Sequence, residues 1–231
     1  MVDIRANLQN VRGEINETAL ACGRDPASVR LLAVSKTFGA DAINLAASVG
    51  QKAFGENRVQ EAESKIPLVK SPGIEWHLIG HLQSNKARRA VELFDVVQSV
   101  DSEKLARVLD RNAAEQGKRL PVCLEVNVGE EAQKSGVLPS ELRQLITIVG
   151  TLNHLEVRGL MAIPPWSDDP EMSRPYFRRL AGLLNEINRS LAAPLTQLSM
   201  GMSHDFKVAI QEGSTLVRVG TAIFGKREAN G

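Results

Sequence analysis

The sequence has few cysteines, almost no net charge and no long hydrophobic run. Its two cysteines, Cys22 and Cys123, form no paired pattern, which excludes a disulfide framework. Lys and Arg number 28 against 27 Asp and Glu, so the basic bias typical of nucleic-acid-binding proteins is missing. No apolar stretch reaches membrane-spanning length, and the polar segment 1–5 lacks a signal-peptide core. We therefore expect a cytoplasmic protein that binds neither membranes nor nucleic acids.

The sequence also lacks a linker. Neither a Ser/Gly/Pro tract nor a long charged run divides the 231 residues, so we expect a single domain over 1–231. Short apolar runs rich in residues with branched side chains alternate with segments of helical periodicity along the whole chain. The predicted strands are 31–36, 53–57, 74–79, 94–100, 122–128, 157–163, 195–200 and 216–219. A helical segment follows each of them, and one more, capped by Asp3, precedes the first.

Eight strands that alternate with helices imply parallel strands joined by crossover helices. Eight such units in one chain of this length predict an α/β fold, a single (β/α)8 TIM-type barrel with an extra N-terminal helix. An open doubly wound sheet is the alternative fold. The absence of a GxGxxG sequence after the first strand argues against that alternative.

The run 31–37, Leu-Leu-Ala-Val-Ser-Lys-Thr, carries the first candidate reactive group. It has the composition of a buried strand, and Lys36 lies at its end. Apolar surroundings disfavour the charged form of an amine, so we expect Lys36 to be pushed towards the neutral, nucleophilic state. A lysine that only extends its amine into solvent from a strand end is the commoner alternative.

Polar residues at the ends of the predicted strands define the mouth of such a barrel, where barrel enzymes place their active sites. They are Lys36, Glu56, Asn57, His77, Ser99, Asn127, Ser199 and Arg218. Each alone is compatible with a solvated strand end. Together they would surround one mouth with a lysine, an arginine and several small hydrogen-bonding groups.

The loops after the seventh and eighth strands predict a phosphate site. Ser203 is expected to begin a short helix, where free backbone N–H groups and the helix dipole favour an anion. Gly220 would let the backbone approach a phosphate closely, and Thr221 adds a hydroxyl group. An ordinary helix cap and an ordinary turn glycine are the alternative, but barrels commonly bind phosphate with these two loops.

The chain resembles the pyridoxal-phosphate homeostasis protein family (YggS/PROSC-like), which has the fold of the alanine racemase N-terminal domain. The resemblance spans most of the chain and is specific in combination. The matching stretches are LLAVSKT at 31–37, FGEN at 54–57, WHLIGHLQSNK at 76–86, KSG at 134–136, GLMAIP at 159–164, LSMGMSHD at 198–205 and GSTLVRVGTAIFG at 213–225.

The resemblance implies that the cofactor is pyridoxal 5'-phosphate (PLP) and that Lys36 holds its aldehyde as an internal aldimine. It implies that Arg218 meets the pyridine nitrogen and that Asn57 lies near the ring. The remaining implied cofactor contacts are Ser203, Gly220 and Thr221 to the phosphate, together with Ser199 and Met202. The sequence departs from the family pattern at Arg58, where an aromatic residue is usual, and at His204, where an acid is usual.

Weaker signals do not change this interpretation. His77 and His81 lie four residues apart, but no cysteine or carboxylate partner has ligand spacing, so we expect no metal. The cluster of Lys86, Arg88 and Arg89 indicates a helix face exposed to solvent. Lys134 in the KSG stretch is either a second anion contact or part of a plain loop.

Three functions remain open. The first is a PLP carrier that acts in PLP homeostasis, as a monomer that meets apo PLP-dependent enzymes transiently. The second is a PLP-dependent racemase or other PLP enzyme, and the third is a cofactor-free isomerase of phosphorylated substrates. We favour the carrier, without appreciable racemase activity, because racemisation needs two bases on opposite faces of the substrate. The only tyrosine, Tyr176, is predicted on an outer helix, and the sequence ends at Gly231, soon after the eighth strand.

Overall fold

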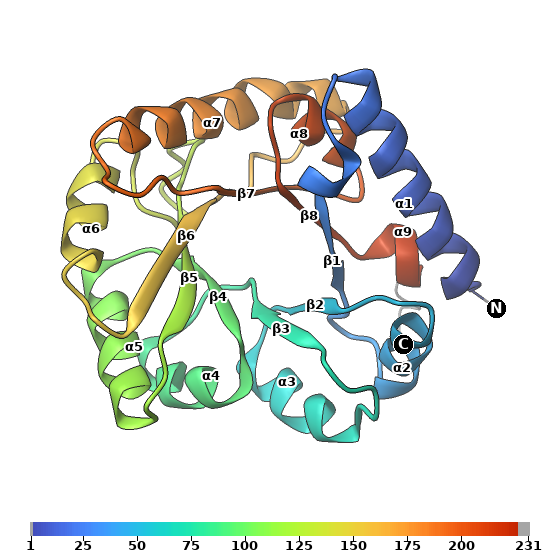
Figure 1. Ribbon diagram of the computed structural model, residues 1–231, viewed down its shortest axis with the longest axis horizontal. Coiled ribbons are helices and arrows are strands. Elements are labelled where there is room, and N and C mark those ends of the chain that lie inside the picture. The colour runs from blue at the N-terminus through green and yellow to red at the C-terminus, as the bar shows by residue number, and fades with distance from the viewer. Residues whose placement is uncertain (1, 226–231) are drawn as a thin grey trace.

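The computed structural model describes residues 2–225, which form a closed barrel of parallel strands surrounded by helices (Figure 1). The strands follow one another around the barrel in sequence order, and β8 pairs with β1 to close it. The predicted TIM-type barrel is therefore confirmed, and the open-sheet alternative is wrong. No helix among the described residues is long and apolar enough to cross a membrane.

All eight predicted strands are present, with ends shifted by a few residues at most. They are β1 (Arg30–Val34), β2 (Ala53–Glu56), β3 (Glu75–Leu78), β4 (Val96–Val100), β5 (Leu120–Glu125), β6 (Leu155–Met161), β7 (Gln197–Met202) and β8 (Leu216–Val219). Most of their residues are buried, since helices cover the outside of the barrel and side chains fill the inside.

A helix follows every strand. The helices are α1 (Ile4–Ala21), α2 (Ala40–Ser48), α3 (Val59–Lys65), α4 (Ala87–Leu93), α5 (Glu103–Glu115), α6 (Leu142–Val149), α7 (Arg174–Asn188), α8 (Phe206–Gln211) and α9 (Thr221–Phe224). Short 3-10 helices lie at Pro26–Ser28, Ile66–Leu68, Ser84–Lys86 and Pro170–Ser173.

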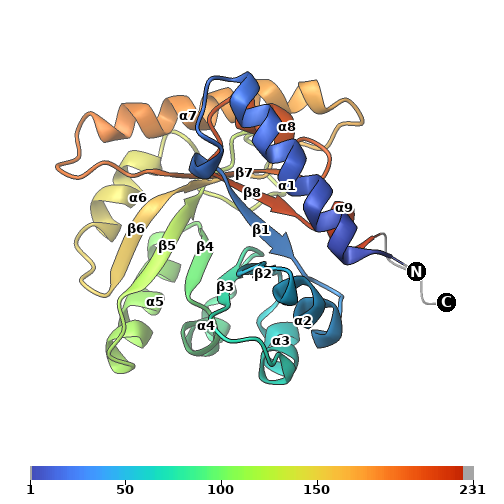
Figure 2. The same ribbon diagram turned by 45° about the vertical axis from the view of Figure 1, so that its right-hand side comes forward.

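The extra helix, α1, packs on the outside of the barrel against α8 and α9 (Figure 2). The side chain of Asp3 caps it, since its Oδ1 accepts the N–H groups of Arg5 and Ala6 at 3.1 Å. The apolar face predicted from the spacing is buried and consists of Ile4, Leu8, Val11, Ile15 and Ala19. The last helix, α9, has only four residues, and α1 packs against it as well as against α8.

Ser102 caps α5, and the neighbouring Asp101 carboxylate lies 3.5 Å from His81 Nδ1. The start of α8 differs from the prediction. Ser203 does not begin α8, which starts at Phe206 after Asp205. The Asp205 carboxylate accepts the Met202 N–H at 2.7 Å and closes a turn before the helix, so the helix starts three residues later than predicted.

Candidate functional site

A cavity of about 640 Å³ opens at the carboxyl ends of the strands. Residues from the ends of β1, β5 and β8 and from the loops after β2, β3, β6 and β7 line it. Seven of the eight predicted cofactor contacts line this cavity: Lys36, Asn57, Met202, Ser203, Arg218, Gly220 and Thr221. The remaining predicted contact, Ser199, lies beneath it.

Lys36 lies two residues beyond the end of β1, and its side chain is exposed at the cavity. The strand stops at Val34, two residues earlier than predicted, so Lys36 lies on the loop that follows it. Within residues 2–225, the Lys36 amine has neither a hydrogen-bond acceptor nor a salt-bridge partner. The amine is thus free to meet a ligand in the cavity.

The loops after β7 and β8 meet at the cavity, as predicted. The Ser203 hydroxyl oxygen accepts the backbone N–H groups of Gly220 at 3.2 Å and Ala222 at 3.4 Å. A Cβ at Gly220 would lie 3.0 Å from the Val34 carbonyl oxygen, a closer approach than most side chains make. Thr221 is exposed beside them. Hydroxyl and amide groups from two loops therefore gather at one side of the mouth.

Arg218 comes from β8 and is 3% exposed. Its Nη1 donates to the carbonyl and the hydroxyl of Ser199, at 2.6 and 2.8 Å, and its Nη2 donates to the Ala162 carbonyl at 2.9 Å. Burial lowers the pKa of Arg218 to about 10, against the opposing charges of Asp205 and Glu125. The guanidinium therefore stays positive at neutral pH, fixed on one side and open to the cavity on the other.

Asn57, Met202 and Ser199 occupy three different settings. Asn57 lies half-buried after β2, and Gly80 packs so closely on its backbone that a Cβ would lie 2.3 Å from the Asn57 carbonyl oxygen. Met202 ends β7 beside Arg218. Ser199 is fully buried and reaches the cavity only through its hydrogen bonds to Arg218.

Glu125, at the end of β5, was missed by the sequence reasoning. It is 7% exposed and lines the cavity, and its Oε2 has no hydrogen-bond partner in the described part of the chain. Burial first, and then the negative charge of Asp101, raise the pKa of Glu125 to about 7, although Arg218 opposes this shift. The available signal was a single charged residue at the end of the apolar run 120–124.

We expect Glu125→Gln to stabilise the protein above neutral pH and to have little effect in acid. Between the ordinary pKa of 4.5 and about 7, the folded protein holds a proton at Glu125 that the unfolded chain has released. Wild-type stability therefore falls as pH rises through this window, by at most about 3 kcal/mol. Urea unfolding at the two ends of the window measures the difference.

The control for this experiment is Glu115→Gln on the exposed end of α5, which should change stability by no more than about 0.5 kcal/mol at either pH. Equal stabilities of wild type and Glu125→Gln above neutral pH would show that Glu125 finds a charge partner in solution.

Trp166 and His204 form the outer rim of the cavity. Trp166 is 72% exposed, and its ring centroid lies 5.1 Å from that of His204. The departure at His204 thus replaces a negative charge at the mouth by an aromatic contact. Arg58, the other departure, is exposed before α3 and does not line this cavity.

Lys134 is the second lysine that lines the cavity. Its amine donates to the Pro164 carbonyl at 3.2 Å and lies 2.5 Å from Glu131 Oε2. Unlike Lys36, Lys134 is therefore held in an ion pair. The cluster Lys86, Arg88 and Arg89 lies elsewhere; Arg88 and Arg89 pair with Glu92 and are 76% and 41% exposed, as expected for a solvated helix face.

The two histidines spaced four residues apart are separated by the fold. His77 lies inside the barrel and is 1% exposed, whereas His81 lines the mouth. Between residues 2 and 225, no three His, Cys, Asp or Glu side chains are grouped so that they could hold a metal ion. That the protein uses no metal stays a prediction.

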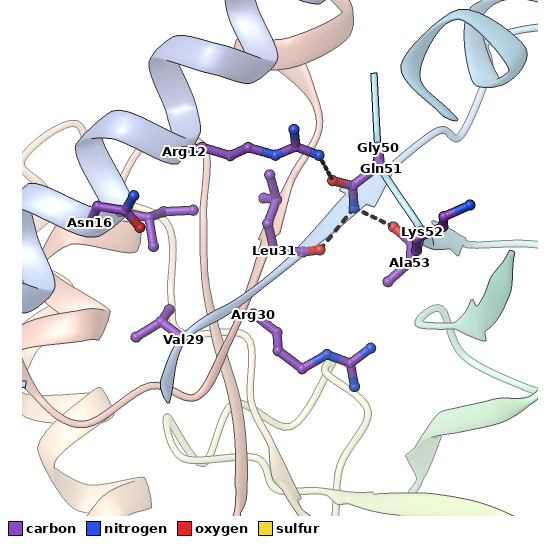
Figure 3. A pocket seen from close by; sticks show the side chains of 10 residues that line it. Arg12, Asn16, Val29, Arg30, Leu31, Gly50, Gln51, Lys52 and Ala53 are labelled. Atoms are coloured by element: carbon purple, nitrogen blue, oxygen red, sulfur yellow. Dashed lines mark hydrogen bonds between the residues drawn. The ribbon is translucent and has the colours of Figure 1, made fainter. Parts of the chain in front are cut away.

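A smaller cavity, of about 270 Å³, lies between α1 and the amino-terminal ends of β1 and β2 (Figure 3). There Arg12 donates to the Val49 carbonyl at 2.9 Å and to Gln51 Oε1 at 3.1 Å. The Gln51 amide in turn donates to the carbonyls of Leu31 and Ala53. These groups satisfy one another and tie α1 to the barrel, so we assign this cavity a structural role.

The comparisons with known proteins agree with this geometry. The family model "Alanine racemase, N-terminal domain" matches residues 4–228. The chain is 45% identical over 228 residues to the pyridoxal phosphate homeostasis protein of Pseudomonas aeruginosa, covering 99% of this chain and 97% of the relative. It is 43% identical over 235 residues to that of Escherichia coli K12, covering 99% and 98%.

Among solved structures, PipY of Synechococcus elongatus PCC7942 with PLP bound has a TM-score of 0.85 and 41% identity, over 96% of this chain and all of PipY. Alanine racemase of Clostridium difficile 630 has a TM-score of 0.69 at 16% identity, over 98% of this chain and 57% of the racemase, and shows the fold alone. The fold and its mouth thus define a parallel barrel of the racemase type. The chain belongs to the alanine racemase N-terminal-domain family and, within it, to the pyridoxal phosphate homeostasis proteins.

Proposed function

We propose that this chain binds PLP covalently through Lys36 and hands it on to other proteins, without racemising amino acids at a physiological rate. The observation that carries the proposal is the unpaired Lys36 amine, which shares one cavity with Arg218 and with the Ser203 and Gly220 loops. Relatives named as pyridoxal phosphate homeostasis proteins, and the PLP-bound structure of PipY, support it.

The donor groups of the cavity fit the two ends of the cofactor. Arg218 uses three of its N–H donors on Ser199 and Ala162, which leaves Nε–H and one Nη2 hydrogen without a protein acceptor in residues 2–225. These donors suit an unprotonated pyridine nitrogen, which is an acceptor. The hydroxyls of Ser203 and Thr221, with the backbone at Gly220, suit a phosphate. Asn57, Met202 and Ser199 would complete the surroundings of the ring, with Ser199 acting from below.

A cofactor held in this way is suited to transfer and unsuited to carbanion chemistry. Lys36 would hold the cofactor through its aldehyde, in a linkage that would be open to exchange with water or another amine. PLP acts as an electron sink in its enzymes, but a charged Arg218 placed against the ring nitrogen would keep that nitrogen unprotonated. A neutral ring withdraws fewer electrons, so α-carbanions are stabilised less.

The only tyrosine of the chain does not line the mouth, where racemisation would require a second base. Tyr176, the only tyrosine, lies in α7 on the outside of the barrel, half-buried against the core. Lys134 is held in its ion pair with Glu131. We therefore propose a monomeric, cytoplasmic, single-domain protein over 1–231 that meets apo PLP-dependent enzymes transiently at its open mouth.

A paired experiment tests the proposal. The protein loaded with PLP is mixed with an apo-enzyme that requires PLP, and recovery of that enzyme's activity is followed. In parallel it is incubated with L-alanine and other amino acids, and the opposite enantiomer is measured by chiral chromatography. We expect reactivation without turnover. Racemisation at about 1 s⁻¹ or faster would identify an enzyme instead.

The phosphate contacts make a separate prediction. Ser203→Ala combined with Thr221→Ala should weaken PLP affinity by one to several orders of magnitude, because each hydrogen bond to a charged group contributes about 1.5–3 kcal/mol. The matched control is Ser48→Ala with Thr147→Ala, whose exposed hydroxyls donate only to carbonyls of their own helices. Fluorescence titration with PLP measures both; equal affinities would place the phosphate elsewhere.

A further inference from the structure

A chain of hydrogen bonds crosses the barrel interior from Arg218 to Glu75. Arg218 Nη1 donates to Ser199 Oγ at 2.8 Å, and Ser199 Oγ donates to Gln98 Oε1 at 2.5 Å. Gln98 Nε2 lies 2.7 Å from His77 Nδ1, and His77 Nε2 lies 3.0 Å from Glu75 Oε1. Four strands, β8, β7, β4 and β3, thus contribute to one continuous chain.

The chemistry of these groups allows the chain only one direction. A guanidinium can only donate, so the Ser199 oxygen accepts from Arg218 and its hydrogen goes to the Gln98 carbonyl oxygen. The Gln98 amide nitrogen then donates to His77 Nδ1, which must carry no hydrogen. The remaining imidazole hydrogen is on Nε2 and points at the Glu75 carboxylate. A cation therefore lies at one end of the chain and an anion at the other, an arrangement in which each bond polarises the next.

The middle of the chain is sealed from solvent. Gln98 and Ser199 are 0% exposed and His77 is 1% exposed, in an interior that barrels of this type fill mainly with branched apolar side chains. A buried polar group that loses its partner there cannot turn to water, so each member fixes the orientation of the next. The Glu75 end is anchored as well, because Arg30 Nη2 donates to Glu75 Oε2 at 2.6 Å.

We propose that Gln98 is a positioning residue that fixes the guanidinium of Arg218 at the mouth, through Ser199 and with its own amide held by His77 and Glu75. The claim that this guanidinium faces a cofactor rests on the proposed function. The claim that Gln98 fixes the guanidinium does not depend on the proposed function. The residue was missed in the sequence because Gln98 stands inside the apolar strand β4, with no neighbouring motif.

The first test uses the cofactor-free protein and nitrogen-15 NMR. We expect His77 to show the neutral form with hydrogen on Nε2, and the Nη signals of Arg218 to be separate because rotation of the guanidinium is blocked. In Gln98→Met the Nη signals should merge and His77 should lose this single form. The matched control is Gln51→Met. It removes another buried amide, whose hydrogen bonds do not belong to the series that joins Arg218 to Glu75 (Figure 3).

A variant that reverses the direction of the hydrogen bond between residue 98 and His77 distinguishes a positioning role of Gln98 from a packing role. In Gln98→Glu the new carboxylate still accepts from Ser199 but can no longer donate to His77. We expect His77 to gain a second hydrogen, on Nδ1, and the separate Arg218 signals to return. If Gln98→Met does not fold, Gln98→Asn, whose amide is too short to reach both partners, takes its place.

The second test measures PLP binding at the mouth. Gln98→Met should weaken PLP affinity by about tenfold and shift the absorption of the bound form, while Gln51→Met should match wild type. Hydrogen on His77 Nδ1 in the wild type, or unchanged Arg218 signals in Gln98→Met, would overturn the proposal. Failure of the wild type to bind PLP would overturn the proposed function alone, since the NMR comparison needs no cofactor.

Discussion

Lys36→Ala should abolish covalent attachment of PLP completely. The expected result is loss of the visible absorption band of the bound form and of any PLP trapped on the protein after borohydride reduction. The physical reason is that Lys36 is the cavity lysine whose amine has no partner in the described residues, so it alone is available to condense with an aldehyde. Intact mass and peptide mapping of the reduced protein measure it.

Lys134→Ala is the matched control, because it removes the other lysine that lines the cavity. The Lys134 amine is engaged by Glu131 and by the Pro164 carbonyl, so its loss should leave covalent trapping at Lys36 intact. A reduced peptide from the wild type that carries PLP at Lys134 would show that Lys134, and not Lys36, forms the bond. Trapping that persists undiminished in Lys36→Ala would do the same.

The parts of the fold that follow from local patterning were predictable. The eight strands could be located because each is a short, mostly apolar run bounded by turn residues, and buried parallel strands show this pattern. The N-terminal helix could be predicted together with its cap, because Asp3 precedes an apolar repeat at spacings of four, three and four. Closure into a barrel followed from the count of strands and the alternation.

The parts of the site that depend on contacts across the barrel were not predictable. The polarity of Ser203 marked it correctly as a mouth residue, but its helix position was wrong because Asp205, two residues later, closes the turn. The first strand was predicted to reach Lys36 but ends at Val34, because strand composition does not reveal where a strand ends. The roles of Gln98 and Glu125 could not be predicted, because they depend on Ser199, His77 and Arg218, which lie on other strands.

The loop that carries Lys36 is held by a buried ion pair on its inner side. Lys65, 7% exposed at the end of α3, donates to Glu56 Oε1 at 2.8 Å, to Glu61 Oε1 at 2.9 Å and to the Ser35 carbonyl at 2.9 Å. The Ser35 hydroxyl also donates to Glu56 at 2.6 Å. The residue after Lys36, Thr37, has a φ of 71°, a left-handed conformation that β-branched residues rarely adopt, and its N–H donates to Glu61.

Lys65→Met should therefore destabilise the protein by about 3–5 kcal/mol, the cost typical of leaving one member of a buried ion pair alone. Glu56 is 0% exposed, so its carboxylate would keep only the Ser35 hydroxyl as a donor. Burial already raises the pKa of Glu56 in the wild type, and the loss of Lys65 removes the hydrogen bond and the positive charge that oppose this shift, leaving only the Ser35 hydroxyl to oppose it. The defect should accordingly shrink as pH falls, because protonation of Glu56 removes the unpaired charge.

Urea unfolding measures this loss against Lys207→Met, the same substitution in an exposed ion pair. Lys207 and Glu14 lie 2.8 Å apart and are 54% and 44% exposed, so that variant should lose no more than about 1 kcal/mol. Adding Glu56→Gln to Lys65→Met should recover part of the stability, because a neutral amide is less costly to bury than a lone carboxylate. Lys65→Met should also weaken PLP affinity, because the Ser35 carbonyl next to Lys36 loses the Lys65 amine that holds it. Adding Glu56→Gln should not recover this affinity, because the Lys65 amine is still missing. Full recovery of affinity in the double variant would show that this ion pair stabilises the barrel without positioning Lys36.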